Sequence, residues 1–238
     1  VNLGTPDKPT AFSVMRYLRQ FLSDRRVIEV PRVIWFFLLN FIILPFRSSK
    51  SAAKYSKIWK DDSPLRTITS SITKKVSNQI NNQNYLFEYA MRYGNPSIEF
   101  GLKNLQAKGV EELLLLPMFP HYAQATTESA LKHTYKQLKA IKWQPKIIEM
   151  GHFETDEEYV IPLANSIESQ LDKDAHLLFS YHGLPVSHVK RIDTSKNHCQ
   201  QVDECCSIKS EANALCYGHH CMNTTQTVVG LLGLSKDQ

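Results

Sequence analysis

Two hydrophobic patterns alternate along the chain: short apolar runs, and longer stretches whose apolar residues recur at helical spacing. Near the start, helical spacing predicts helices over residues 11–22, 51–60 and 63–80. Further on, apolar runs predict strands that alternate with helices. The predicted strands cover residues 85–94, 110–120, 145–151 and 175–183, and the helices between them cover residues 95–109, 126–141 and 155–171. Such alternation is typical of a parallel sheet covered by helices on both faces, so we expect an α/β fold.

The most apolar stretch is PRVIWFFLLNFIILPF, residues 31–46, which is interrupted only by Arg32 and Asn40. Its apolar run is shorter than the ~20 residues that a helix needs to span a bilayer. The stretch predicts either a buried core helix or a partly exposed apolar lip that rests on a membrane or grips a flat ligand. Trp35, with Arg32 and Arg47 on either side, is typical of an interfacial position, so both interpretations stay open.

Composition adds few constraints. The chain has 238 residues, of which 42% are hydrophobic and 21% charged, and its net charge is +5. The basic residues are scattered, so nucleic-acid binding is not indicated. The first thirty residues lack the pattern of a signal peptide, which predicts a cytoplasmic protein whose cysteines bind metal or stay free.

In parallel α/β sheets, ligands bind outside the carboxyl ends of the strands. Polar residues that directly follow the apolar runs are therefore candidates for a binding site. These residues are Thr5, Arg92, Tyr93, His121, Tyr122 and His182.

Six motifs occur in one order along the chain: VNLGTPDKPT, YLRQFLSDRRVIEVPR, ILPFRSSKSAAKYSKIW with the SPL that follows it, MRYGNPSIEFGL, LLPMFPHYAQATTES and LLFSYHGLP. Together they resemble the ferrochelatases, which insert ferrous iron into protoporphyrin IX in the last step of protohaem synthesis. The resemblance implies two doubly wound parallel-sheet lobes with the porphyrin in the cleft between them. Residues 1–150 would form the first lobe, and residues 151–238 would form an incomplete second lobe.

The resemblance implies that His182, in SYHGLP, is the active-site base or the residue that handles the iron. Metal insertion releases two pyrrole protons, and a neutral histidine can accept a proton near physiological pH. The structural alternative for His182 is a histidine that merely ends a strand.

The resemblance also offers candidates that hold the porphyrin. Propionate contacts are expected from Arg92, Tyr93, Tyr55 and Ser63, and the pocket wall from Tyr122 and Thr127. For each of these six, an ordinary surface or packing role is the alternative.

Two features depart from the family pattern. The glutamate motif that ferrochelatases carry near the C-terminus is missing, so we expect a fragment with little activity of its own. The segment after SYHGLP is interrupted by an insertion. Three other functions stay open: insertion of iron into coproporphyrin, insertion of cobalt or nickel into a related tetrapyrrole, and non-catalytic sensing of iron or redox state.

All five cysteines lie between residues 199 and 221, in the order C-x5-C-C-x9-C-x4-C. This spacing matches neither common zinc sites nor plant ferredoxins. Some ferrochelatases carry a [2Fe–2S] cluster on inserted cysteines, and the resemblance therefore suggests such a cluster here. The expected ligands are Cys199, Cys206, Cys216 and Cys221, with Cys205 as the alternate to Cys206.

A zinc ion and free thiols remain alternatives to the cluster. His198, His219 and His220 are possible substitute ligands, although histidines in a basic loop more often face solvent. The expected partners are a porphyrin and the surface of the inner membrane, with no nucleic acid.

Overall fold

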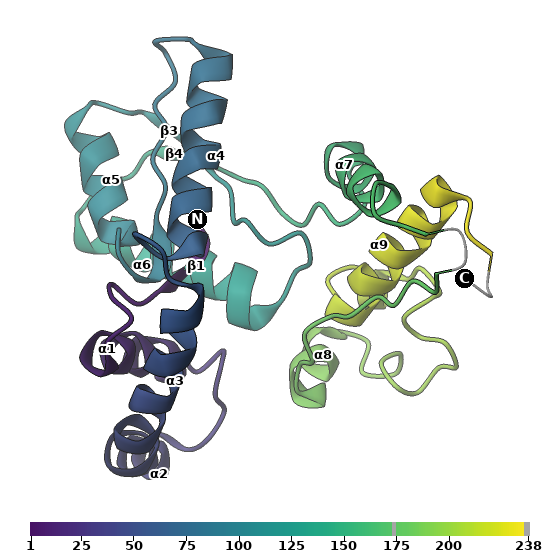
Figure 1. Ribbon diagram of the computed structural model, residues 1–238, viewed down its shortest axis with the longest axis horizontal. Coiled ribbons are helices and arrows are strands. Elements are labelled where there is room, and N and C mark those ends of the chain that lie inside the picture. Colours follow the sequence, from purple (N-terminus) through teal and green to yellow (C-terminus); the bar gives the residue numbers. More distant parts are fainter. Residues whose placement is uncertain (173–174, 236–238) are drawn as a thin grey trace. The chain divides into compact units, whose positions relative to one another are not determined.

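The computed structural model describes residues 1–172 and 175–235 (Figure 1). The chain divides into two compact units. Residues 1–118 and 124–150 form the first unit, and residues 119–123 and 151–238 form the second. The chain leaves the first unit at residue 150, the expected lobe boundary, but the short segment 119–123 packs with the second unit. The division into two folding domains stays a prediction.

Four short strands form two parallel two-stranded sheets in the first unit. They are β1 (Asn2–Thr5), β2 (Met91–Gly94), β3 (Glu112–Leu115) and β4 (Lys146–Glu149). Strand β1 pairs with β2, and β3 pairs with β4. Two backbone hydrogen bonds, from Val1 to Leu116 (2.6 Å) and from Met118 to Val1 (2.8 Å), join β1 to the segment after β3 in a parallel pattern. These bonds connect the two two-stranded sheets, and parallel strand pairs that alternate with helices confirm the expected α/β class.

Helices cover these sheets. They are α1 (Ala11–Leu22), α4 (Pro64–Ile80), α5 (Ile98–Ala107) and α6 (Ser129–Ala140), the last preceded by the π-helical turn η2 (Gln124–Glu128). Two of them start at a side-chain cap, because Thr10 accepts from the N–H of Ser13 and Ser97 accepts from the N–H of Phe100. The core has two clusters, one between α1 and the long helix described next, and one between α5, β3 and α6.

One continuous helix contains the apolar stretch. It runs through α2 (Arg32–Phe37), the π-helical η1 (Leu38–Ile43) and α3 (Leu44–Ile58). By length and composition alone, the span Arg32–Ile58 could cross a membrane, and 17% of its most apolar window is buried. Leu39 and Leu44 face the core. The outer face, named here the apolar face, consists of Val33, Ile34, Phe36, Phe37, Phe41, Ile42 and Phe46, which are 54–72% exposed.

This exposure overturns the interpretation of residues 31–46 as a buried core helix. It also corrects the role expected for Trp35. The indole Nε1 donates to the carbonyl of Leu22 at 2.7 Å, and the ring packs against the core, so Trp35 anchors the helix rather than facing outward.

The second unit is mainly helical in its described residues. It contains α7 (Glu157–Glu168), α8 (Val186–Ile192), the 3-10 turn η3 (Glu211–Asn213) and α9 (Tyr217–Leu232). Helices α7 and α9 pack through Val160, Ala164 and Val228. The strand expected over residues 175–183 is not formed. A strand needs a hydrogen-bonded neighbour, and no described segment pairs with these residues, among which Leu178 is 88% exposed.

Candidate functional site

A buried polar cluster lies in the first unit, where β2 meets the loop after α1. Arg92 Nη2 lies 2.6 Å from Oδ2 of Asp24, and the hydroxyl of Tyr93 lies 3.0 Å from the same oxygen. Ser129 donates its hydroxyl to Asp24 and accepts from Nε of Arg92 at 2.8 Å. The guanidinium of Arg92 also lies 4.3 Å from the ring centre of Tyr93. We call these four residues the Asp24 cluster.

The Asp24 cluster keeps its carboxylate ionised. Burial raises the pKa of Asp24, but hydrogen bonds from Ser129, Tyr93 and the backbone of Arg26, together with the charge of Arg92, lower the pKa below its usual value. Burial is also the main cause that raises the pKa of Tyr93, so the phenol stays protonated. Arg92 and Tyr93 are therefore committed to Asp24, which limits their freedom to turn toward a substrate.

The other candidates of the first unit lie in separate surroundings. Tyr55 is half-buried, with its ring edge-on to Tyr17 at 6.4 Å between centroids. Buried Ser63 accepts a hydrogen bond from Thr5 at 2.8 Å, which ties the end of β1 to the start of α4. Thr127 is 1% exposed, and its hydroxyl has no hydrogen-bond partner among the described residues. Their substrate contacts stay predictions.

His182 is exposed in the extended segment before α8 of the second unit. Its Nδ1 lies 2.8 Å from the carbonyl oxygen of Gly183. A carbonyl only accepts hydrogen bonds, so Nδ1 carries the proton and the lone pair of Nε2 is free. This tautomer can accept a proton or bind a metal ion at Nε2.

Helix α9 holds the segment that carries His182. The hydroxyls of Tyr181 and Thr225 lie 2.8 Å apart, and the backbone of His182 bonds the hydroxyl of Tyr217. Burial raises the pKa of Tyr217 to about 12, and the thiol of Cys221 contributes to this shift through charge and a hydrogen bond. The first turn of α9 is therefore common to the His182 segment and to the cysteine-rich insertion.

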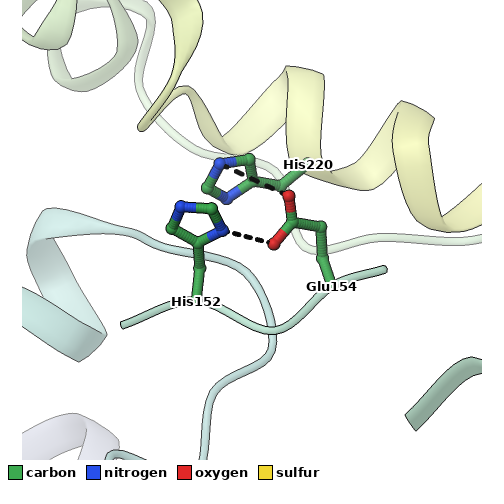
Figure 2. A group of neighbouring side chains, drawn as sticks. All are labelled: His152, Glu154 and His220. Carbon is green, nitrogen blue, oxygen red and sulfur yellow. Dashed lines mark hydrogen bonds and ion pairs between the residues drawn. The ribbon is translucent and has the colours of Figure 1, made fainter. Parts of the chain in front are cut away.

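Figure 2 shows a second polar group, in which the buried carboxylate of Glu154 lies beside the stacked rings of exposed His152 and buried His220. His152 Nδ1 lies 2.6 Å from one carboxylate oxygen, and His220 Nε2 lies 3.7 Å from the other. The two rings stack with their centres 4.2 Å apart. Burial raises the pKa of Glu154, but the hydrogen bond to His152 and a backbone hydrogen bond lower it overall.

The three ligand atoms lie within 4.8 Å of one another, a spacing that could suit a metal ion. The hydrogen bonds of His220 argue against one. Its Nδ1 accepts from the backbone N–H of Tyr122 at 3.1 Å, and its Nε2 donates to the carbonyl of Ala214 at 2.9 Å. Both nitrogens are thus in use, and a neutral imidazole in this tautomer has no lone pair left for a metal. We read the group as a hydrogen-bonded clamp that joins Tyr122, Glu154 and α9.

His121 extends this clamp. Its Nε2 lies 2.9 Å from the hydroxyl of Thr224, which donates in turn to the backbone carbonyl of Glu154 at 2.9 Å. Tyr122 was expected to line the pocket wall. Its backbone N–H contacts α9 by donating to His220, and its contact with a substrate stays a prediction.

Four cysteine thiols share one neighbourhood in the insertion. Cys205 Sγ lies 4.0 Å from Cys206 Sγ. A Cβ built on Gly218 would lie 2.9 Å from Cys206 Sγ and 3.9 Å from Cys216 Sγ, so these two thiols pack on the same glycine. Burial raises the pKa of Cys199, and the thiols of Cys216 and Cys205 raise it further.

Cys221 lies at the edge of this group. Burial raises its pKa to about 11, a hydrogen bond from Tyr217 lowers it, and Cys216 is the thiol that influences it. By contrast, burial raises the pKa of Cys206 to about 12, with further contributions from three thiols, those of Cys205, Cys216 and Cys199.

The insertion is ordered by two polar side chains. Asp193 accepts from the backbone N–H groups of Ser195, Lys196, His198 and Cys199, at 2.9–3.1 Å. Asn213 donates to the carbonyls of Cys205 and Ile208 at 2.9 and 2.7 Å. These bonds fix the backbone of the loop around the thiols.

Comparison with known proteins identifies the family. The family model described as Ferrochelatase matches residues 1–238. The chain belongs to the ferrochelatase family. The chain is 38% identical over 240 residues to the ferrochelatase of Haemophilus influenzae (strain PittEE), covering 100% of this chain and 68% of that protein. For the ferrochelatase of Francisella tularensis subsp. novicida (strain U112), identity is 38% over 207 residues, covering 84% of this chain and 62% of the relative.

Ferrochelatase 2 of Shewanella oneidensis is 36% identical over 244 residues, covering 100% of this chain and 68% of that protein. The chain therefore spans about two thirds of the length of these ferrochelatases. The parallel strand pairs of the first unit are consistent with a lobe of the ferrochelatase fold.

Sequence reasoning missed several residues of these polar groups. Asp24 does not follow a predicted strand, so the search at strand ends did not select it. Its position before two arginines, in SDRR, was the one local signal. Glu154 lies just before the helix predicted over residues 155–171, which forms as α7, and no motif marked it as part of a site. His219 and His220 were expected to face solvent, but they are 5% and 1% exposed, because α9 turns them toward the loop and the clamp.

Proposed function

We propose that the protein to which this chain belongs inserts ferrous iron into protoporphyrin to form haem. The match of the ferrochelatase family to the whole chain carries this proposal. Relatives in three genera bear the same name, which favours iron insertion over the coproporphyrin, cobalt or sensor alternatives. Fe²⁺ and the porphyrin are both substrates.

His182 acts as the base that accepts a pyrrole proton. Fe²⁺ replaces two pyrrole protons of the porphyrin, so a group near the ring nitrogens must accept a proton as the metal enters. The free Nε2 lone pair of His182 is suited to this step, and the bond from Nδ1 to Gly183 fixes the tautomer. No electron moves in the reaction, so the iron stays ferrous.

In the full-length protein, His182→Ala is expected to lower kcat by roughly 10²–10⁴-fold, the usual contribution of a general base. Porphyrin binding, measured by fluorescence quenching, should stay within about twofold. His176→Ala, at another exposed histidine of the same segment, is the matched control. Near-normal kcat in the His182 variant would show that another group accepts the proton.

The thiols of the insertion hold a [2Fe–2S] cluster in this proposal. Thiolate sulfur is the donor that iron–sulfur clusters require. Two ligands of a tetrahedral metal with bonds of about 2.3 Å lie about 3.8 Å apart, close to the 4.0 Å between Cys205 and Cys206. When bound, such a cluster supplies a redox-active centre that cross-links the loop.

The thiol neighbourhood favours Cys199, Cys205, Cys206 and Cys216 as ligands. The sequence suggested Cys221 in place of Cys205. Cys221 bonds Tyr217 instead and has one thiol neighbour, whereas Cys205 is adjacent to both Cys206 and Cys199. Cys216 also precedes the first turn of α9, where the helix dipole favours a thiolate.

Full-length protein purified without oxygen is expected to be red-brown, with about two irons and two acid-labile sulfides per chain, the composition of this cluster type. Cys205→Ser should lose the iron and the colour, while Cys221→Ser should keep both. The reverse result would restore Cys221 as the fourth ligand. Colourless protein with one zinc per chain would exclude the cluster.

The apolar face provides a peripheral contact with the membrane, on the cytoplasmic side. The apolar part of the helix, residues 33–46, is about 21 Å long at about 1.5 Å per residue, shorter than the ~30 Å hydrocarbon core. Arg47, Lys50, Lys54 and Lys57 follow it. The helix is therefore suited to lie in the interface rather than to span the bilayer.

Replacing Phe37 and Phe41 together by serine should lower the fraction of full-length protein that floats with anionic liposomes at least tenfold. These rings are 58% and 65% exposed, so the fold should be unaffected. Phe100→Ser, at a ring 56% exposed on α5, is the control. Unchanged flotation of the double variant would contradict the membrane contact, and a lowered unfolding temperature would point to a packing role.

A further inference from the structure

A cavity of about 550 Å³ lies in the first unit, lined by β2, by the residues that follow it and by parts of α1 and α6. Its volume falls in the usual range of small-molecule pockets, about 300–1,000 Å³. Seven of its lining residues are arginine or lysine, and one, Asp24, is acidic. We call it the cationic cavity.

Protein carboxylates balance only part of this positive charge. Asp24 pairs with Arg92 at 2.6 Å and also lies 4.0 Å from Arg26. Arg26 reaches Glu128, outside the lining, at 3.2 Å. Arg16 reaches Asp7, likewise outside, at 3.6 Å.

Four lining cations have no such partner. Within the described part of the chain, no carboxylate lies within 4.0 Å of Arg25, Arg32, Lys132 or Lys136. Arg25 and Arg32 flank the loop before α2, and the two lysines are one turn apart on α6. Like charges gathered around a concave surface raise the local potential and attract anions.

His133 lines the cavity, and its pKa reflects this positive potential. Burial lowers its pKa to about 4, and the charges of Arg92 and Lys136 contribute, outweighing Asp24 and Glu99. The histidine is thus neutral at physiological pH and adds no charge of its own, although its ring can bond a ligand.

The donors suit a tetrahedral oxyanion. Arginine presents a planar fork of N–H groups that bonds phosphate oxygens in pairs. The first turn of α5 lines the cavity at Ser97 and Ile98, and a helix N-terminus adds partial positive charge.

We propose that the cationic cavity binds a multiply charged oxyanion of the phosphate type, held by Arg25, Arg32, Lys132 and Lys136. The structure offers two sources for such a group: a soluble phosphate compound, or the headgroup of an acidic phospholipid. The second source has a structural reason, since Arg32 lines the cavity and is also the first residue of the helix that carries the apolar face. Only the phospholipid source depends on the membrane contact proposed above.

The test uses the full-length protein and pyrophosphate as the probe, titrated by calorimetry at constant ionic strength. Lys132→Gln with Lys136→Gln should weaken binding at least tenfold. Lys139→Gln, at an exposed lysine on the same helix but outside the cavity, should leave it unchanged. Bound pyrophosphate should also raise the pKa of His133, measured by NMR, because an anion stabilises the imidazolium.

No measurable pyrophosphate binding, or equal binding by the double and control variants, would overturn the proposal. A raised KM for porphyrin in the double variant, with pyrophosphate binding unchanged, would overturn it too, by assigning the lysines to the substrate. Iron insertion by the wild-type protein is measured in parallel, so a failure of the cavity proposal is distinct from a failure of the proposed reaction.

Vesicles distinguish the two sources. Vesicles of phosphatidylcholine with about one third phosphatidylglycerol are compared with pure phosphatidylcholine. If the lysine double variant loses the preference for the anionic vesicles, the headgroup is the ligand. If it keeps that preference while losing pyrophosphate, the ligand is a soluble phosphate compound. The Phe37 and Phe41 serine variant should bind pyrophosphate normally in either case.

Discussion

The ion pair between Asp24 and Arg92 is the contact on which the polar interior of the first unit depends. One carboxylate receives the guanidinium and two hydroxyls, and so connects β2 and α6 to the loop after α1. Because the folded pKa of Asp24 lies below its ordinary value of 3.8, this stabilisation is present at neutral pH and is lost as the pH falls below that value. Four other cations of the cavity, Arg25, Arg32, Lys132 and Lys136, have no carboxylate within 4.0 Å in the described part of the chain.

Hydrogen bonds between side chains and loops organise the described residues of the second unit. Glu154 and His220 clamp the start of α9 to the segments around Tyr122 and His152, and Tyr217 on the same helix supports the His182 segment. Cys216 and Cys221 flank that turn. A structural change at the thiols can therefore shift the His182 segment, because both contact the first turn of α9.

The sequence predicted the α/β class, the helices α1 and α4–α7, and the family, because apolar periodicity and local motifs depend on neighbouring residues. It failed where tertiary contacts decide. Trp35 matched an interfacial pattern, yet a bond to Leu22 turns it inward. Residues 175–183 have the apolar run of a strand, but a strand forms only with a partner. Asp24 and Arg92 lie 68 positions apart, and Glu154 and His220 lie 66 apart, so no local pattern signals either pair.

Asp24 and Arg92 act as one unit, and a double-mutant cycle measures their coupling directly. Urea unfolding of the full-length protein is compared for wild type, Asp24→Asn, Arg92→Met and the double variant. Each single change leaves a buried charged or polar group without its partner and should cost about 3–5 kcal/mol. The double variant should be less destabilised than the sum of the two, by at least about 1 kcal/mol. Losses that add within about 0.5 kcal/mol would contradict the account.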